Sequence, residues 1–191
     1  LVSRSEVVGL FDEVFGAAER HRIDPSYFEY LTVAAYLFFS RAGADVAVLA
    51  MGDFNDDPFD LSLRVHAVAL RERGDVERAQ SAKLFNLAWG YLNQSVVDHR
   101  GKPREIDGTL YFGGDGNVFD QILVSKGLLA GPHPLKVRLG SARIEAVPDM
   151  VDHKVGEGPI RFGLPKGDAA KNVNTDGFSD HFPVSVVIEE G

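Results

Sequence analysis

Five oxygen-bearing side chains crowd into one short segment directly after an apolar run. The apolar run is VAVLAM, residues 46–51, and the segment that follows is GDFNDDPFD, residues 52–60, which supplies Asp53, Asn55, Asp56, Asp57 and Asp60. Carboxylates this close repel one another at neutral pH unless a cation lies among them. Asp53 could accept a proton from water or hold a metal, and Asn55 could donate to an anionic oxygen. A turn is the alternative, since Gly, Asn, Asp and Pro dominate turns for conformational reasons, and composition leaves both interpretations open.

Asp120 is a second candidate, in the stretch NVFDQILVS, residues 117–125. Alternation along a strand places it on the same face as Val118, Ile122 and Val124. A carboxylate on an apolar face is costly to bury without a partner. We therefore expect a donor beside Asp120, an imidazole or an arginine, and favour this over an edge strand with Asp120 in solvent.

Asp180 and His181 form a third candidate, just before a predicted strand that begins at Phe182. Neighbouring side chains on a strand point to opposite sides, so these two would serve different partners. One could bind a metal while the other meets Asp120 or a phosphate; a capped loop with an incidental histidine is the alternative. Asp53 and Asp180 are 127 positions apart, so only the fold can bring them together.

The elements that must position these residues begin with helices. Apolar spacing after Ser5, a predicted N-cap, indicates one helix, and Asp24-Pro25 begins a second that ends at Gly43. Residues 46–51 have the pattern of a strand covered on both faces. Short helical segments are predicted over residues 61–70 and around residues 84–91.

The remainder of the chain has the composition of strands and turns. Residues 109–112, a glycine-rich turn and residues 118–124 predict a β-hairpin. Further strands are predicted at 141–147 and 184–188, separated by a long loop over 148–178. Mixed helices and strands without a linker favour one domain, residues 1–191, with a layered α/β sandwich.

Composition limits the possible functions. The 191 residues contain no cysteine, which excludes disulfides and thiolate metal sites, and no apolar run long enough to cross a membrane. The net charge is −8 with no basic block, so the chain by itself would be a poor passive binder of nucleic acid. A serine nucleophile is not indicated, because a G-x-S-x-G elbow is missing.

Taken in order, GDFNDDP, NVFDQILVS and SDHFPV resemble the endonuclease/exonuclease/phosphatase superfamily, the DNase I-like hydrolases. The resemblance is best from Val46 to Ile188, the C-terminal part of the family's domain. It implies an α/β (α+β) fold, the C-terminal portion of a four-layered α/β/β/α sandwich. It also implies hydrolysis of phosphate esters with a divalent cation, Mg²⁺ or else Mn²⁺ or Ca²⁺.

The resemblance assigns a role to each candidate. Asp53 would orient or deprotonate the attacking water, and Asn55 would hold the phosphoryl oxygens. His181 would contact the scissile phosphate, with Asp120 positioning the imidazole and stabilising its charged form. Asp180 would be a metal ligand.

The residues around Asp53 and Asn55 have less defined roles. Asp57 and Asp60 are predicted to be turn and helix-cap residues, and Asp56 stays open between turn and site.

The family's N-terminal motifs, an Asn and a Glu that hold the principal metal, are not found in this sequence. Residues 1–4 resemble the segment after a mid-domain Asn-His pair of the family. We therefore expect a chain that lacks part of the layered core, is inactive alone, and is marginally stable through an exposed sheet face or edge.

The resulting functional prediction is a metal-dependent phosphodiesterase, with a nuclease slightly favoured. A lipid or small-molecule phosphoesterase is the nearest alternative, because the shared motifs recognise the phosphate and not its substituents. A non-catalytic remnant or binding module is the alternative of another class. The expected partner is a phosphate-ester substrate, with nucleic acid one candidate; neither a protein partner nor a compartment is indicated.

Overall fold

The computed structural model describes residues 3–24, 30, 33–35, 37–38, 47–154, 156–162 and 174–191. The chain divides into two compact units, Leu1–Val46 and Ala47–Gly191, and each is described by itself. Whether they form one domain stays a prediction. Both helices and strands are present, as predicted, and within the described segments no helix is long and apolar enough to cross a membrane.

The first unit contains helix α1, Arg4–His21. Its N-cap is Ser3, not Ser5 as predicted, because Ser3 forms a capping box: its Oγ accepts the amide of Glu6, whose carboxylate accepts the amide of Ser3 at 2.8 Å. Leu10, Val14 and Ala18 form the buried face. The predicted second helix lies largely outside the described residues.

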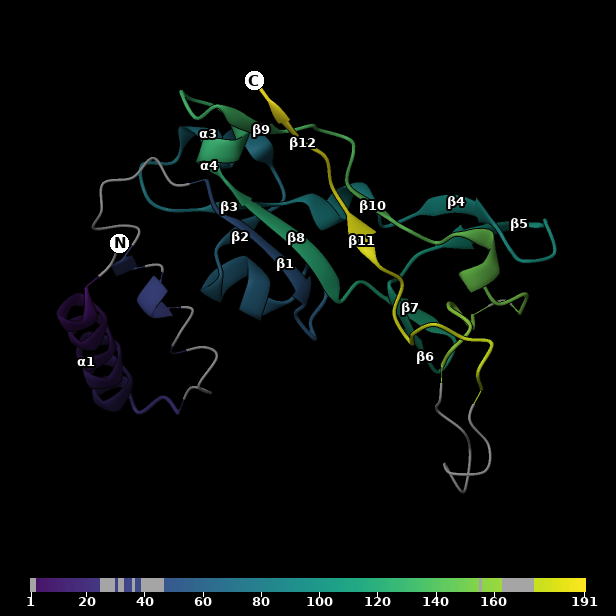
Figure 1. Ribbon diagram of the computed structural model, residues 1–191, viewed down its shortest axis with the longest axis horizontal. Coiled ribbons are helices and arrows are strands. Elements are labelled where there is room, and N and C mark those ends of the chain that lie inside the picture. Colours follow the sequence, from purple (N-terminus) through teal and green to yellow (C-terminus); the bar gives the residue numbers. More distant parts are fainter. Residues whose placement is uncertain are drawn as a thin grey trace. The chain divides into compact units, whose positions relative to one another are not determined.

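The second unit is built around a four-stranded sheet with the order β1-β8-β3-β2. These strands are β1 Leu49–Asp53, β8 Asp120–Ser125, β3 Leu84–Asn86 and β2 Ala69–Leu70. Strand β8 pairs antiparallel with both β1 and β3, while β2 and β3 are parallel. Figure 1 shows β8 crossing the unit between β1 and β3.

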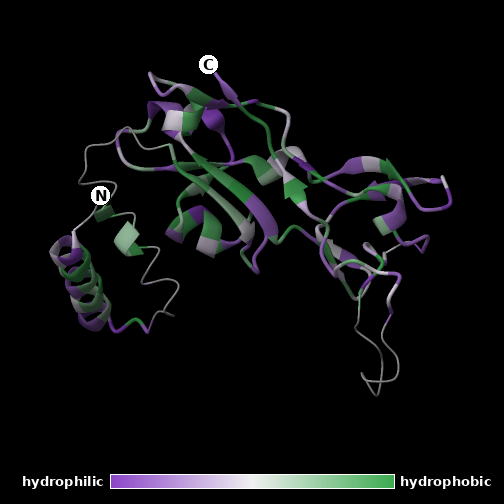
Figure 2. Cartoon of the chain, viewed as in Figure 1, coloured by the Kyte–Doolittle hydropathy of each residue, from purple (hydrophilic) through white to green (hydrophobic). Residues whose placement is uncertain are grey.

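The two faces of this sheet pack against different groups of side chains. Ile122 and Val124 face the main core, whereas Leu123 packs with Leu63 and Ala69 on the other side. Leu63 comes from the π-helical turn η1, Ser62–His66. Figure 2 shows β8 changing from polar at its start to apolar along the rest of the strand. The strand is therefore buried on both faces, and its polar start lies where the candidate residues gather.

Strand β1 differs from its prediction as a strand covered on both faces. Leu49 is 40% exposed and Met51 is 49% exposed, although their partners Val124 and Ile122 are buried. The reason is position, because among the described strands β1 is an edge strand with β8 on one side only. Strand β8, flanked by β1 and β3, shows the pattern that was expected of β1.

The remaining elements are short, and their strands form four two-stranded antiparallel ribbons, β4-β5, β6-β7, β9-β12 and β10-β11. Their bounds are α3 Arg73–Arg78, η2 Leu87–Gly90, β4 Gln94–Val97, β5 Pro103–Ile106, β6 Leu110–Phe112, β7 Asp115–Asn117, α4 Lys126–Leu129, β9 Leu135–Val137, β10 Arg143–Ile144, η3 Pro148–Met150, β11 Val184–Ser185 and β12 Ile188–Glu190.

The predicted hairpin has a different second strand. Its first strand, β6, pairs with β7 across a tight turn at Gly113 and Gly114, whose φ angles are 66° and 99°. Strand β8 instead joins the main sheet. The cause is its apolar sequence on both faces, which a two-stranded ribbon cannot bury.

Other predicted elements are shorter than expected or change type. The helix predicted over 61–70 is η1 followed by β2, and the helical segment at 84–91 is β3 followed by the 3₁₀ turn η2. The strand predicted at 141–147 is reduced to β10, and the closing strand at 184–188 is divided into β11 and β12. Pairing partners far along the chain decide these boundaries, and helical spacing of apolar residues does not reveal them.

Candidate active site

Two candidate carboxylates lie side by side where β1 ends and β8 begins. The register of the antiparallel pair places Asp53 directly opposite Asp120. Cβ atoms of directly opposite residues are about 4.5–5.5 Å apart, and like charges in that arrangement destabilise a sheet. Their proximity is therefore unfavourable for stability unless positive groups or protons lie nearby.

The imidazole of His181 provides such a proton beside Asp120. Its Nδ1 lies 2.7 Å from Oδ2 of Asp120, and the two side chains are only 22% and 15% exposed. An ionised carboxylate can only accept, so Nδ1 carries the proton and donates it to Asp120. The pair thereby leaves Nε2 as the nitrogen that can address a substrate, as acceptor when neutral and donor when protonated.

Thr109 holds the backbones of both partners. Its side-chain Oγ1 accepts the amide of Asp120 at 3.1 Å, and its carbonyl accepts the amide of Phe182 at 2.7 Å. An isolated β-bridge joins Leu110 to His181. Thr109 is fully buried, so water does not replace these bonds. It therefore sets the spacing between the Asp120 and His181 segments.

Replacing Thr109 by valine should lower the free energy of unfolding by about 1–3 kcal/mol, because the amide of Asp120 would stay buried without an acceptor. Thr109→Ser keeps the hydroxyl and should retain most of that stability. Urea unfolding of both variants measures the difference, and Thr175→Val serves as an exposed control. Equal stability of the Val and Ser variants would contradict the role of the hydroxyl.

Tyr91 forms a further hydrogen bond to the main chain of Asp120. Its hydroxyl donates to the carbonyl of Asp120 at 2.8 Å, and the residue is 2% exposed. Burial, reinforced by the negative charge of Asp120, raises the pKa of Tyr91 well above its ordinary value. The phenol therefore remains a protonated donor at any pH at which the protein would work.

The acidic loop, residues 52–60, is held in place by hydrogen bonds of two consecutive main-chain amides, those of Phe54 and Asn55. Asn55 has a left-handed backbone with φ of 54°, which Asn tolerates better than most residues. Its main-chain amide donates to Asp53 Oδ1 at 2.8 Å. The amide of Phe54 donates to the carbonyl of Phe119 at 2.8 Å. These bonds hold the main chain of Asn55 beside the carboxylate of Asp53.

Asp57 has a role that local sequence patterns do not indicate. Its Oδ1 accepts the amide of Val118 at 2.6 Å, and its own amide donates to Asp60 Oδ2 at 2.8 Å. The first of these bonds crosses from the acidic loop to the segment before β8. Asp57 therefore anchors the loop, in addition to the turn role predicted for it.

The pH dependence of stability should report on Asp57. Burial raises the pKa of its carboxyl above the ordinary 3.8, with Asp60 and Asp56 adding to the rise and the bond from Val118 opposing it. Because its pKa is raised, Asp57 binds its proton more tightly in the folded state than in the unfolded state. The resulting contribution to the free energy of unfolding is present below pH 3.8 and is lost as the pH rises through the raised pKa.

Asp57→Asn should therefore gain stability relative to wild type as the pH increases, since its Oδ1 still accepts from Val118 without a charge. Unfolding measured below pH 3.8 and at neutral pH tests the sign. Asp149→Asn, at an exposed position, is the control. A stability difference that stays constant or shrinks with rising pH would contradict the expectation.

Asp180 is adjacent to His181 and partly buried, but in the described segments it makes no hydrogen bond to the other four candidates. Across the same segments no group of three His, Cys, Asp or Glu side chains is arranged to hold a metal ion. Asp120 is already engaged by His181. The described residues therefore do not form a complete divalent-cation site.

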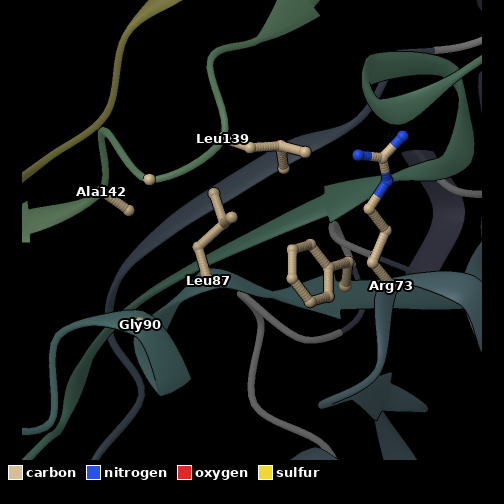
Figure 3. Close-up of a pocket in the computed structure, with 7 residues that line it drawn as sticks. Arg73, Leu87, Gly90, Leu139 and Ala142 are labelled. Carbon is tan, nitrogen blue, oxygen red and sulfur yellow. The ribbon is translucent and has the colours of Figure 1, made fainter.

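A cavity of about 260 Å³ lies elsewhere in the second unit, between η2 and the segment after β9. Figure 3 shows Leu87 and Leu139 facing each other across it, with Arg73 at one side. Its lining is mainly apolar and includes none of the five candidates. The candidate active site is thus at the end of β1 and the start of β8, where Asp53, Asp120 and His181 meet, and not in this cavity.

Sequence patterns pointed to Asp53, Asn55, Asp120, Asp180 and His181 but not to the groups that hold them in place. Thr109 and Tyr91 look like ordinary strand and core residues, and nothing local distinguishes them. The only sequence signal was indirect: a carboxylate on an apolar strand face requires partners.

Comparison with known proteins identifies the family of the chain. No curated protein and no solved structure matches the chain. A family model described as Endonuclease/Exonuclease/phosphatase family matches residues 34–190, a range that contains all five candidate residues. The mixed α/β arrangement fits the predicted DNase I-like fold class. The chain therefore belongs to the endonuclease/exonuclease/phosphatase family.

Proposed function

We propose that this protein is a phosphodiesterase that works by in-line attack of water, and we favour nucleic acid as its substrate. Members of its family are hydrolases that act on phosphate esters. The observation that carries the proposal is the Asp120–His181 pair at 2.7 Å, beside Asp53 at the same end of the sheet.

Each candidate has a step that its chemistry allows. Asp53 orients the water and takes its proton as the water oxygen bonds to phosphorus. Asn55 donates to a phosphoryl oxygen, and His181, held by Asp120, donates from Nε2 to another as negative charge develops there. The bond from phosphorus to the leaving oxygen breaks, and that oxygen takes a proton from solvent.

We also propose dependence on a divalent cation, Mg²⁺ or else Mn²⁺ or Ca²⁺, with Asp180 as one ligand. Such an ion neutralises charge that develops on the phosphate. The described residues do not complete its site, so no step above depends on it.

The test is a substrate panel on the full-length protein, with DNA, RNA, phospholipid and a small phosphodiester, each with and without EDTA. We expect turnover of a nucleic acid, its loss in EDTA and its loss in Asp53→Asn. The net charge of −8 makes the lipid and small-ester arms informative, because those substrates are less strongly repelled.

If only phospholipid or only the small ester is hydrolysed, that compound replaces nucleic acid as the proposed substrate. Turnover that survives EDTA would remove the cation dependence. A folded protein that hydrolyses nothing, or that is indifferent to Asp53→Asn, would favour a non-catalytic module and overturn the proposal.

A further inference from the structure

Two carboxamide side chains are fully buried on the face of the four-stranded sheet opposite Asp120. Asn86 ends β3 and Gln121 follows Asp120 in β8, and both are 0% exposed. Nδ2 of Asn86 donates to Oε1 of Gln121 at 2.5 Å. Burying amides is costly unless every polar atom finds a partner, so their partners show what the pair holds.

Each carboxamide is satisfied by the protein itself. Nε2 of Gln121 donates to the carbonyl of Asp56 at 2.6 Å and to the carbonyl of Val118 at 3.0 Å. Oδ1 of Asn86 accepts the amide of Ala88 at 2.9 Å. Because Asn86 donates to Oε1, the Gln121 amide has one orientation, with both Nε2 protons directed at main-chain carbonyls.

The two carbonyls belong to the two segments that carry the candidate chemistry. Asp56 directly follows Asn55, whose left-handed backbone is a conformation that the surrounding structure must maintain. Val118 lies two residues before Asp120. A single amide therefore holds the acidic loop against the start of β8.

We propose that Gln121, oriented by Asn86, is a positioning residue that fixes the loop of Asn55 relative to Asp120. Asp57 gives the loop a second attachment through Val118, so loss of the Gln121 bonds should loosen the loop without detaching it. The consequence for turnover rests on the proposed function, whereas the effect on the loop does not.

The test uses Gln121→Glu, whose protonated form can still donate to Asp56 and accept from Asn86. Its ionised form has no proton to donate and meets the Asp56 carbonyl with a negative charge. Amide hydrogen exchange of residues 54–57 should match wild type at low pH and become about tenfold faster at higher pH. Wild type is compared at each pH, because the same loop carries other carboxyl groups.

Gln94→Glu is a matched control. Gln94 also spans a carbonyl and an amide, those of Ile144, at 2.6 and 3.1 Å, but in strand β4 away from the acidic loop. Gln94→Glu should leave exchange in residues 54–57 unchanged. Equal acceleration in both variants would show general loosening and overturn the positioning role.

A wild-type measurement protects the test against a variant that fails to fold. The Nε2 protons of Gln121 should exchange with solvent far more slowly than those of Gln80, which is exposed. Comparable rates would overturn the proposal without any mutation.

Turnover then separates the two proposals. We expect kcat of Gln121→Glu to fall about tenfold as pH rises, in parallel with loop exchange and with little change in KM. Altered exchange in a protein without turnover would defeat the proposed function alone. Unaltered exchange across the pH range would defeat the positioning role alone.

Discussion

His181→Ala is expected to lower turnover of a phosphodiester by about 10²- to 10⁴-fold, the usual contribution of a positioned acid–base group. The physical reason is the lost Nε2 donor at the phosphate, together with an Asp120 carboxylate left facing Asp53 without its imidazole partner. Steady-state kinetics of the full-length protein should show the loss mainly in kcat, since the interaction strengthens as negative charge develops.

His66→Ala is the matched control, because His66 is exposed on η1. It should retain wild-type turnover. Circular dichroism of both variants separates lost chemistry from lost structure. A folded His181→Ala protein with turnover within a few-fold of wild type would remove His181 from the mechanism and leave Asp120 with a purely structural partner.

Phe182→Ala should lower the free energy of unfolding by about 3–5 kcal/mol, the usual result of removing a buried aromatic side chain. Phe182 is 0% exposed and belongs to the main core cluster with Ile122 and Tyr111. Domains are typically stable by only about 5–15 kcal/mol, so this loss is a large share of the total. Urea or thermal unfolding measures it directly.

Phe112→Ala provides the comparison within the same chain, because Phe112 is 79% exposed at the end of β6. Its substitution should change stability by no more than about 0.5 kcal/mol. The hydrogen bond from the Phe182 amide to Thr109 is unaffected by truncation of the side chain, so the difference reports core packing. Similar losses in the two variants would show that Phe182 is not a core residue in solution.

The parts of the site that sequence could predict are those with a local cause. An acid on an otherwise apolar strand, Asp120, needed a donor, and the structure supplies His181 at 2.7 Å. A glycine-rich stretch predicted the turn after Phe112, and Gly113 and Gly114 form it, although the strand that follows is β7 and not β8. The family match confirms the resemblance that linked these segments, while the roles of the five candidate residues stay predictions.

The parts that sequence could not predict depend on partners far along the chain. The Asp57–Val118 and Gln121–Asp56 bonds join residues 61 and 65 positions apart. Neither leaves a periodic pattern, because each partner is chosen by the sheet order and not by its neighbours. The prediction that β1 is covered on both faces was wrong for the same reason, because the residues of a strand do not show how many strands lie beside it.

The register of β1 against β8 decides which changes in length this family member can tolerate during evolution. Deleting one residue from β1 would move Asp53 out of line with Asp120 and turn the side chains beyond the deletion to the opposite face. The connection from Ser125, the end of β8, to His181 contains loops that are under no such restriction. Insertions and deletions should therefore accumulate in that connection and be excluded from both strands. The strand register thereby keeps Asp53 opposite Asp120 in related proteins.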